Sequence, residues 1–289
     1  MKTFNYLSSL KTLGAAFLIA LLFANYSAKA QKRLAPGDKI FQSLPVNLPL
    51  PAKPQRYHIT TDYFNHTLAG AFIDKIRVVG DFTTNLPGNK EKWNNVRIAK
   101  SQQLSGEFGL GDSQQFIENF TYQPATGNIT QPEFFRNFPM DAVQVKNLVW
   151  DMAGIEAFAW GHLDSLKLNK TYEAKKMNGA VELAGLGTFT NSNILLTWKG
   201  ISMVNNQLCG LIDFRAMDNP LEINMKMGDA DFSMKGRSHY WGTVYISLNE
   251  KVIEYTELLE DVTMEIKMSN LSKSQFVYTT RYMKVEKIK

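Results

Sequence analysis

The 289-residue chain is 44% hydrophobic and carries a formal net charge of +5. Three of its 32 basic residues and none of its 27 acidic residues lie in the first 30 positions, so the remainder is close to neutral and gives no electrostatic footprint for nucleic acid. The single cysteine, Cys209, excludes an internal disulfide, so the core of one large domain or two small ones must hold the chain together.

The first 30 residues have the layout of a secretory signal peptide. Lys2 and Lys11 precede an apolar run at 13–24, and Ala28 and Ala30 supply the small residues before a cleavage site. The run is short for a bilayer span, which needs about 20 apolar residues. We therefore expect cleavage after Ala30, export to the periplasm or outside the cell, and no transmembrane segment in the mature chain. A retained N-terminal anchor is the alternative.

Residues 31–56 contain five of the ten prolines. Because proline cannot donate to a strand ladder, we expect an extended arm there. Apolar side chains such as Leu44 and Leu48 would also allow this arm to lie across its own domain. The remainder, 57–289, is predicted to be a single β-rich domain with a helical insert at 133–168.

The first part of this domain has strand patterns separated by turn residues. The candidate strands are 72–84, 93–100 and 116–123. Residues 86–89, Leu-Pro-Gly-Asn, form a predicted turn between the first two. The glycines at 106–111 lack the GxGxxG spacing and the strand-to-helix context of a dinucleotide loop, so they predict no nucleotide cofactor.

At 141–160, the spacing of apolar residues changes to that of a helix. Apolar residues recur at steps of three and four: Val145, Leu148, Val149, Met152, Ile155 and Phe158. The following residues, to 168, could continue this central helix. Asp151 and Glu156 argue against a membrane span, so we expect it to pack on a sheet face or to fill a barrel.

Residues 193–284 alternate between apolar and polar side chains, which is typical of a β-meander. The clearest alternations begin at Leu221 and at Val262. Turn residues separate the strands: Asn205-Asn206, Asp218-Asn219-Pro220, Gly228-Asp229 and Asn249-Glu250. The lysines near the C-terminus are typical of a solvated edge strand.

Consecutive strands without helices between them favour antiparallel pairing. The predicted fold is therefore mainly β, an antiparallel meander forming a curved open sheet or barrel, with one central helical insert near 141–168. A sandwich is the alternative architecture.

Candidate catalytic residues cluster around the helix. They are Asp151, Glu156, Asp164 and His162. Two carboxylates near aromatic side chains could act as acid and base on a carbohydrate, which predicts a secreted hydrolase. The alternative interpretation is a packed helix whose acidic side chains simply face solvent. The four histidines have no metal-binding spacing, so neither a metal nor another cofactor is expected.

The leading hypothesis is a non-enzymatic exported carrier that presents an apolar groove to a hydrophobic, lipid-like ligand. Methionines are frequent in the meander, and methionine adapts to irregular apolar surfaces. The candidate ligand-binding residues are Trp160, Tyr240, Trp241, Tyr245, Met225 and Met264. A surface or matrix protein acting through its proline-rich arm is a further alternative, and the sequence names no protein partner.

Overall fold

A computed structural model provides the fold and describes residues 43–227, 229–270 and 272–288. The predicted signal peptide and the first part of the arm, 31–42, lie outside the described residues. Residues 44–289 form one compact unit.

Strands make up most of this unit. The β-strands are β1 (Gln55–Thr67), β2 (Phe72–Leu86), β3 (Lys90–Ser101), β4 (Asp112–Ser113), β5 (Phe120–Tyr122), β6 (Thr171–Glu173), β7 (Gly179–Glu182), β8 (Gly187–Asn191), β9 (Ile194–Val204), β10 (Gln207–Met227), β11 (Ala230–Ser247), β12 (Ile253–Met268) and β13 (Gln275–Ile288). The α-helices of the described part are α3 (Thr126–Ile129) and α4 (Val143–Trp160), and the 3₁₀ helices are η1 (Gln115–Ile117), η2 (Pro132–Phe135) and η3 (Lys175–Met177).

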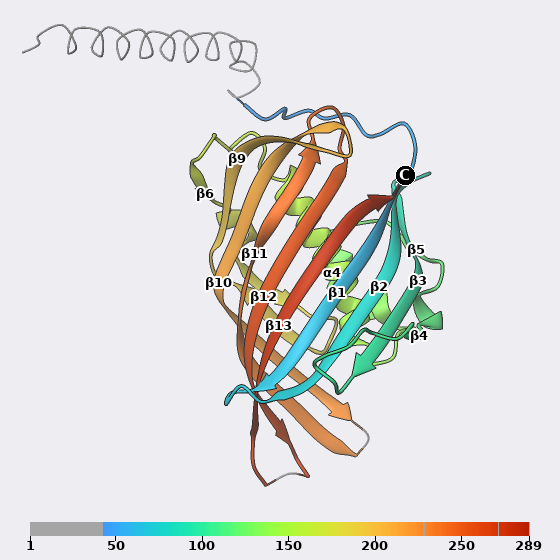
Figure 1. The fold of residues 1–289 in the computed structure, drawn as a ribbon, viewed down its shortest axis with the longest axis vertical. Helices are drawn as coiled ribbons and strands as arrows, with labels where there is room; N and C mark the ends of the chain where they lie inside the picture. The colour runs from blue at the N-terminus through green and yellow to red at the C-terminus, as the bar shows by residue number, and fades with distance from the viewer. Residues whose placement is uncertain (1–42, 228, 271, 289) are drawn as a thin grey trace, which may run out of the picture. The chain divides into compact units, whose positions relative to one another are not determined.

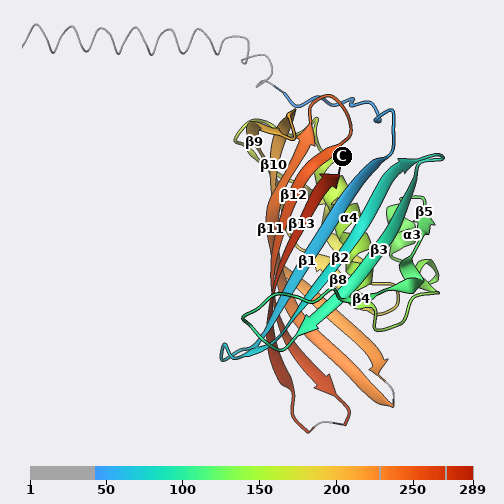
Figure 2. The same cartoon turned by 45° about the vertical axis from the view of Figure 1, so that its right-hand side comes forward.

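All paired strands belong to one antiparallel sheet that curves around α4 (Figures 1 and 2). Its main path runs β4-β3-β2-β1-β13-β12-β11-β10-β8-β7, and within the described residues its two ends do not pair with each other. The prediction of a mainly β, antiparallel, curved open sheet with a central helix is confirmed, and the sheet is not a closed barrel.

The central helix lies on the concave side of the sheet. Its predicted apolar stripe is buried throughout, from Val145 to Phe158. Phe158 stacks on Phe214 of β10, with ring centroids 4.7 Å apart. The helix ends at Trp160, so its predicted continuation is wrong: turns follow, and Leu168 forms an isolated bridge with Trp198 of β9.

Residues Asp218-Asn219-Pro220 form a bulge inside β10, and the predicted turn at this position is wrong. The register to β11 shifts between Ala216 and Asn219, and Asp218 has φ +60°. A bulge changes which residues face inward. Phe214 and Ala216 are buried before it, and Ile223 is buried after it. On either side of the bulge, the buried residues of β10 therefore change from even to odd numbers, although they belong to one strand.

The predicted hairpin at Asn205-Asn206 is confirmed, because both residues have positive φ and connect β9 to β10. Two other predictions are wrong. Residues 116–123 form part of η1 and the short strand β5 rather than one strand. The lysine-rich C-terminal strand β13 is not an edge, because it pairs with both β1 and β12.

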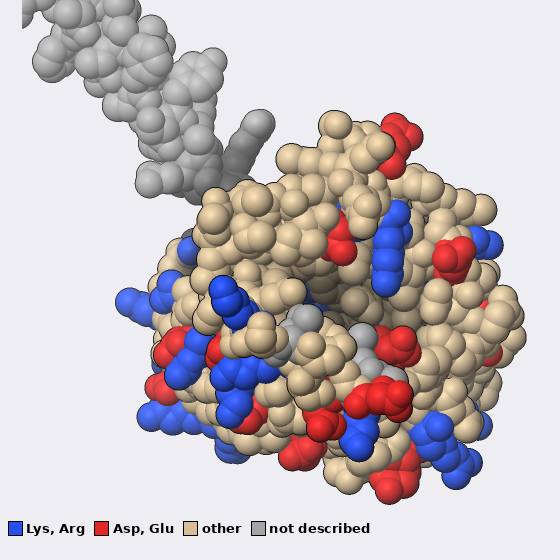
Figure 3. Space-filling model, turned by 90° about the horizontal axis from the view of Figure 1, so that it is seen from below, with Lys and Arg blue, Asp and Glu red and all other residues tan. Residues whose placement is uncertain are grey.

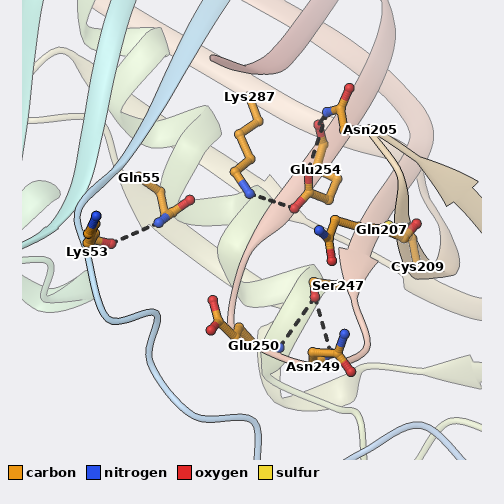
Figure 4. Close-up of polar contacts among 10 residues, drawn as sticks. All are labelled: Lys53, Gln55, Asn205, Gln207, Cys209, Ser247, Asn249, Glu250, Glu254 and Lys287. Atoms are coloured by element: carbon orange, nitrogen blue, oxygen red, sulfur yellow. Dashed lines mark hydrogen bonds and ion pairs between the residues drawn. The ribbon is translucent and has the colours of Figure 1, made fainter. Parts of the chain in front are cut away.

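From Leu44 on, the described part of the arm belongs to this unit, and the buried side chains of Leu44 and Leu48 pack in its core. Backbone contact adds to this, because Lys251 donates its N–H to the carbonyl of Pro49 at 2.9 Å. Nearby, Lys287 of β13 and Glu254 of β12 form a 2.7 Å ion pair beside Cys209 (Figure 4).

Candidate functional site

A cavity of about 950 Å³ lies between the concave face of the sheet and α4. Strands β1, β2, β10, β11, β12 and β13 all contribute to its wall. Its apolar side chains include Ile76, Ile223, Met234, Leu258, Met264 and Ile266. The volume lies within the range of about 300–1,000 Å³ that ligand pockets occupy, and the wall is mainly apolar.

Small residues on α4 leave this space open. Ala153, Gly154 and Ala157 line the cavity. A Cβ atom added to Gly154 would meet no atom within 4 Å, so the helix surface is unfilled at that point. The larger residues of α4, such as Leu148 and Ile155, are buried in the core. The helix therefore packs through one side and borders a cavity with another.

A second recess, of about 880 Å³, shares Leu186 with the cavity. Met225 and Met268 line it together with Phe232, from strand ends near the β10–β11 and β12–β13 hairpins. Seen from this end, the molecule is hollowed, and side chains of both charges surround the hollow (Figure 3). The recess extends the methionine-rich lining toward that end of the sheet.

A buried ionic cluster interrupts the apolar wall. Arg281 of β13 donates hydrogen bonds from Nη1 and Nη2 to the two carboxylate oxygens of Asp151, at 2.7 and 3.0 Å. Its Nε lies 2.7 Å from Glu260 Oε2, an ion pair in which the N–H is not aligned for a hydrogen bond. The three side chains are 7%, 13% and 14% exposed. Burial raises the pKa of Asp151, while Arg281 opposes that rise.

More polar side chains continue from this cluster along the cavity wall. Thr279 Oγ1 donates to Asn65 Oδ1 at 2.6 Å, and Asn65 Nδ2 donates to Asp74 Oδ1 at 2.6 Å. All three residues line the cavity. The polar wall is therefore rich in carboxylate oxygens, which are acceptors.

Glu156, a predicted catalytic residue, pairs with another acid. It hydrogen-bonds Glu91 of β3, and Glu91 in turn contacts Tyr122. Burial is the main reason why the pKa of Glu156 is held well above its ordinary value, and the charge of Glu91 raises it further. The pKa of Glu91 is also raised by burial. These two carboxyl groups share a site that favours the protonated form of one of them.

The four predicted catalytic residues do not form one constellation. Asp151 lines the cavity, whereas Glu156, five residues later, is directed to Glu91. His162 is buried and contacts Tyr172 with ring centroids 5.3 Å apart, and burial lowers its pKa. Asp164 is exposed and accepts a hydrogen bond from Ser165.

The predicted ligand-binding residues do not share one site. Tyr240 and Met264 line the cavity, and Met225 lines the second recess. Trp241 is exposed, and Tyr245 packs against Tyr255. Trp160 is partly buried against the hydrophobic core. Strand alternation separates Tyr240 from Trp241, which is why neighbours in sequence do not share a site.

Sequence reasoning missed Arg281, Glu260, Asn65 and Gly154. A usable signal existed for Glu260. Glu260 shares the inward parity of Leu258 and Val262 in β12, where a charged residue would otherwise be costly. No comparable local signal marks Gly154, because its role depends on what lies opposite the helix.

None of the helices in the described ranges is long and apolar enough to cross a membrane. Within these same ranges, no group of three or more histidine, cysteine or acidic residues is arranged to hold a metal ion.

No protein-family model matches the sequence, and no curated protein matches it significantly. Among solved structures, the chain is similar to one described as showing lipid–protein interactions in lipovitellin, with 12% sequence identity and a TM-score of 0.39. The similarity covers 83% of this chain and 25% of the lipovitellin chain, so this chain spans about a quarter of the length of that chain.

Proposed function

We propose that this protein is an exported, non-enzymatic carrier that encloses the apolar part of a lipid-like ligand between its sheet and α4. The observation that carries this proposal is the cavity of about 950 Å³, within the range of about 300–1,000 Å³ typical of ligand pockets. Export is supported by the signal-peptide pattern of the first 30 residues.

The composition of the wall supports an apolar ligand of irregular shape. Met234 and Met264 contribute flexible thioether side chains to the wall. On the helix, the small residues Ala153, Gly154 and Ala157 leave space for a ligand. Methionine side chains adjust to different apolar partners at little cost.

Native mass spectrometry of residues 31–289 purified from the source organism is the first test. We expect an additional mass of a few hundred daltons that denaturation releases. A second measurement follows the binding of the neutral fluorescent probe N-phenyl-1-naphthylamine, which does not depend on a ligand surviving purification. Absence of both a bound mass and saturable probe binding would overturn the proposal.

Gly154 offers a matched pair of variants for locating the site. Gly154→Phe would place a ring in the cavity, and we expect it to weaken probe binding at least tenfold. Gly154→Ala adds one methyl group where space is free and should leave binding nearly unchanged. Equal binding by both variants would contradict this location.

A further inference from the structure

The ionic cluster in the cavity constrains the polar end of the proposed ligand, and this inference rests on the proposed function. Arg281 is the buried cation of the wall, but its Nη1 and Nη2 atoms are already engaged with Asp151. Its Nε lies beside Glu260. With both acids ionised, the cluster carries one excess negative charge.

A ligand carboxylate is therefore disfavoured at this position. To reach the guanidinium group it would have to displace Asp151 or Glu260, leaving a buried protein carboxylate without its partner. Asp74 adds a further acid to the same wall. Like charges in a site of low dielectric repel strongly.

A hydroxyl group satisfies the cluster better than a carboxylate. The wall of the cavity includes Asp151, Glu260 and Asp74, whose carboxylate oxygens are hydrogen-bond acceptors. A ligand hydroxyl can donate a hydrogen bond to one of these oxygens, whereas a ligand carboxylate can only accept one. We infer that the cavity selects lipid-like molecules whose polar end is a neutral hydroxyl and rejects fatty-acid carboxylates.

The test compares 1-dodecanol with dodecanoate at pH 8, each displacing N-phenyl-1-naphthylamine from residues 31–289. The exposed Lys176 also borders the cavity, so both ligands are measured in a Lys176→Met background that removes a competing cation. We expect dodecanol to bind at least tenfold more tightly than dodecanoate.

Glu260→Gln removes the excess charge with little change in shape and should reduce this preference at least threefold. Glu257→Gln is the matched control, because Glu257 lies on the same strand and hydrogen-bonds Tyr282 rather than Arg281. It should leave the preference unchanged, and thermal unfolding of each variant checks that it is folded.

The outcomes separate the two proposals. If neither ligand displaces the probe, the proposed carrier function is contradicted. If both displace it but dodecanoate binds as tightly as dodecanol, or if Glu260→Gln leaves their ratio unchanged, the inference about the hydroxyl group is wrong and the carrier function stands.

Discussion

Arg281 of β13 and Asp151 of α4 join the sheet to the central helix through two parallel hydrogen bonds, although the residues are 130 positions apart. The pair lies in the wall of an otherwise apolar cavity. Such a contact fixes the helix against the sheet close to the small residues of α4 that leave the cavity open. The same side chains thus set the geometry of the cavity and its polarity.

Replacing Arg281 should cost far more stability than replacing an arginine on the surface. Arg281→Met leaves Asp151 and Glu260 buried without a cation, and we expect a loss of about 3–5 kcal/mol in the free energy of unfolding. Urea unfolding followed by circular dichroism measures it. Arg77→Met is the control, because Arg77 pairs with Asp62 at similar distances but is 39% exposed; its loss should stay below about 1 kcal/mol.

A triple variant separates the role of the ions from that of packing. Replacing Arg281 with Met and both Asp151 and Glu260 with Leu removes every charge of the cluster together. Because buried ion clusters are often no more stabilising than apolar side chains of similar size, we expect recovery of most of the stability lost in Arg281→Met. No recovery would show that the loss reflects packing around residue 281.

The pattern of side chains predicted the strands and the helix because each depends on local periodicity. The stripe from Val145 to Phe158 is buried, and Leu221 and Ile223 of the alternation that begins at Leu221 both line the cavity. The residues at Asp218 predict a turn where the structure has a bulge, because both can use a residue with positive φ. Only pairing with β11, a long-range property, distinguishes them.

The candidate site was less predictable, because it is formed by residues far apart in sequence. The sequence makes Asp151 a catalytic candidate, yet its partner in the structure is Arg281, which belongs to a strand predicted to lie at a solvated edge. A sequence gives strand parity but not which strand lies opposite the helix. For the same reason, the sequence does not predict that Glu91 of β3 lies beside Glu156 of α4.

Asn219 should be the most sensitive residue of the β10 bulge. Its side chain is fully buried, donates to the carbonyls of Ala216 and Ser238, and accepts from the N–H of Ser192. Asn219→Ala leaves these backbone groups without partners, which should cost about 2–4 kcal/mol by chemical denaturation. Asp218→Gly, at the adjacent position with φ +60°, should be neutral or gain up to about 1 kcal/mol. Similar losses in both variants would contradict this assignment.

Cys209 should be unreactive in the folded protein. It is fully buried, and burial raises the pKa of its thiol to about 11, so little thiolate exists at pH 8. We expect iodoacetamide to modify the native protein at least about 100-fold more slowly than the urea-unfolded chain, as measured by mass spectrometry. Comparable rates would show that the strand region around Cys209 opens readily.

The Glu91–Glu156 pair should make the protein less stable as the pH rises. Because burial raises both pKa values in the folded state, that state binds more protons than the unfolded chain above the ordinary glutamate pKa of 4.5. The stability that these raised pKa values contribute is therefore fully present below that value and is lost as the pH rises through them.

The variant Glu156→Gln keeps a hydrogen-bond donor toward Glu91 without the charge. Its free energy of unfolding relative to wild type should increase from pH 4.5 upward, by about 1.4 kcal/mol for each pH unit at most. Urea unfolding at a series of pH values measures this difference, in which contributions from other titrating groups cancel. A difference that is flat with pH would mean that the two carboxyl groups titrate as they do in the unfolded chain.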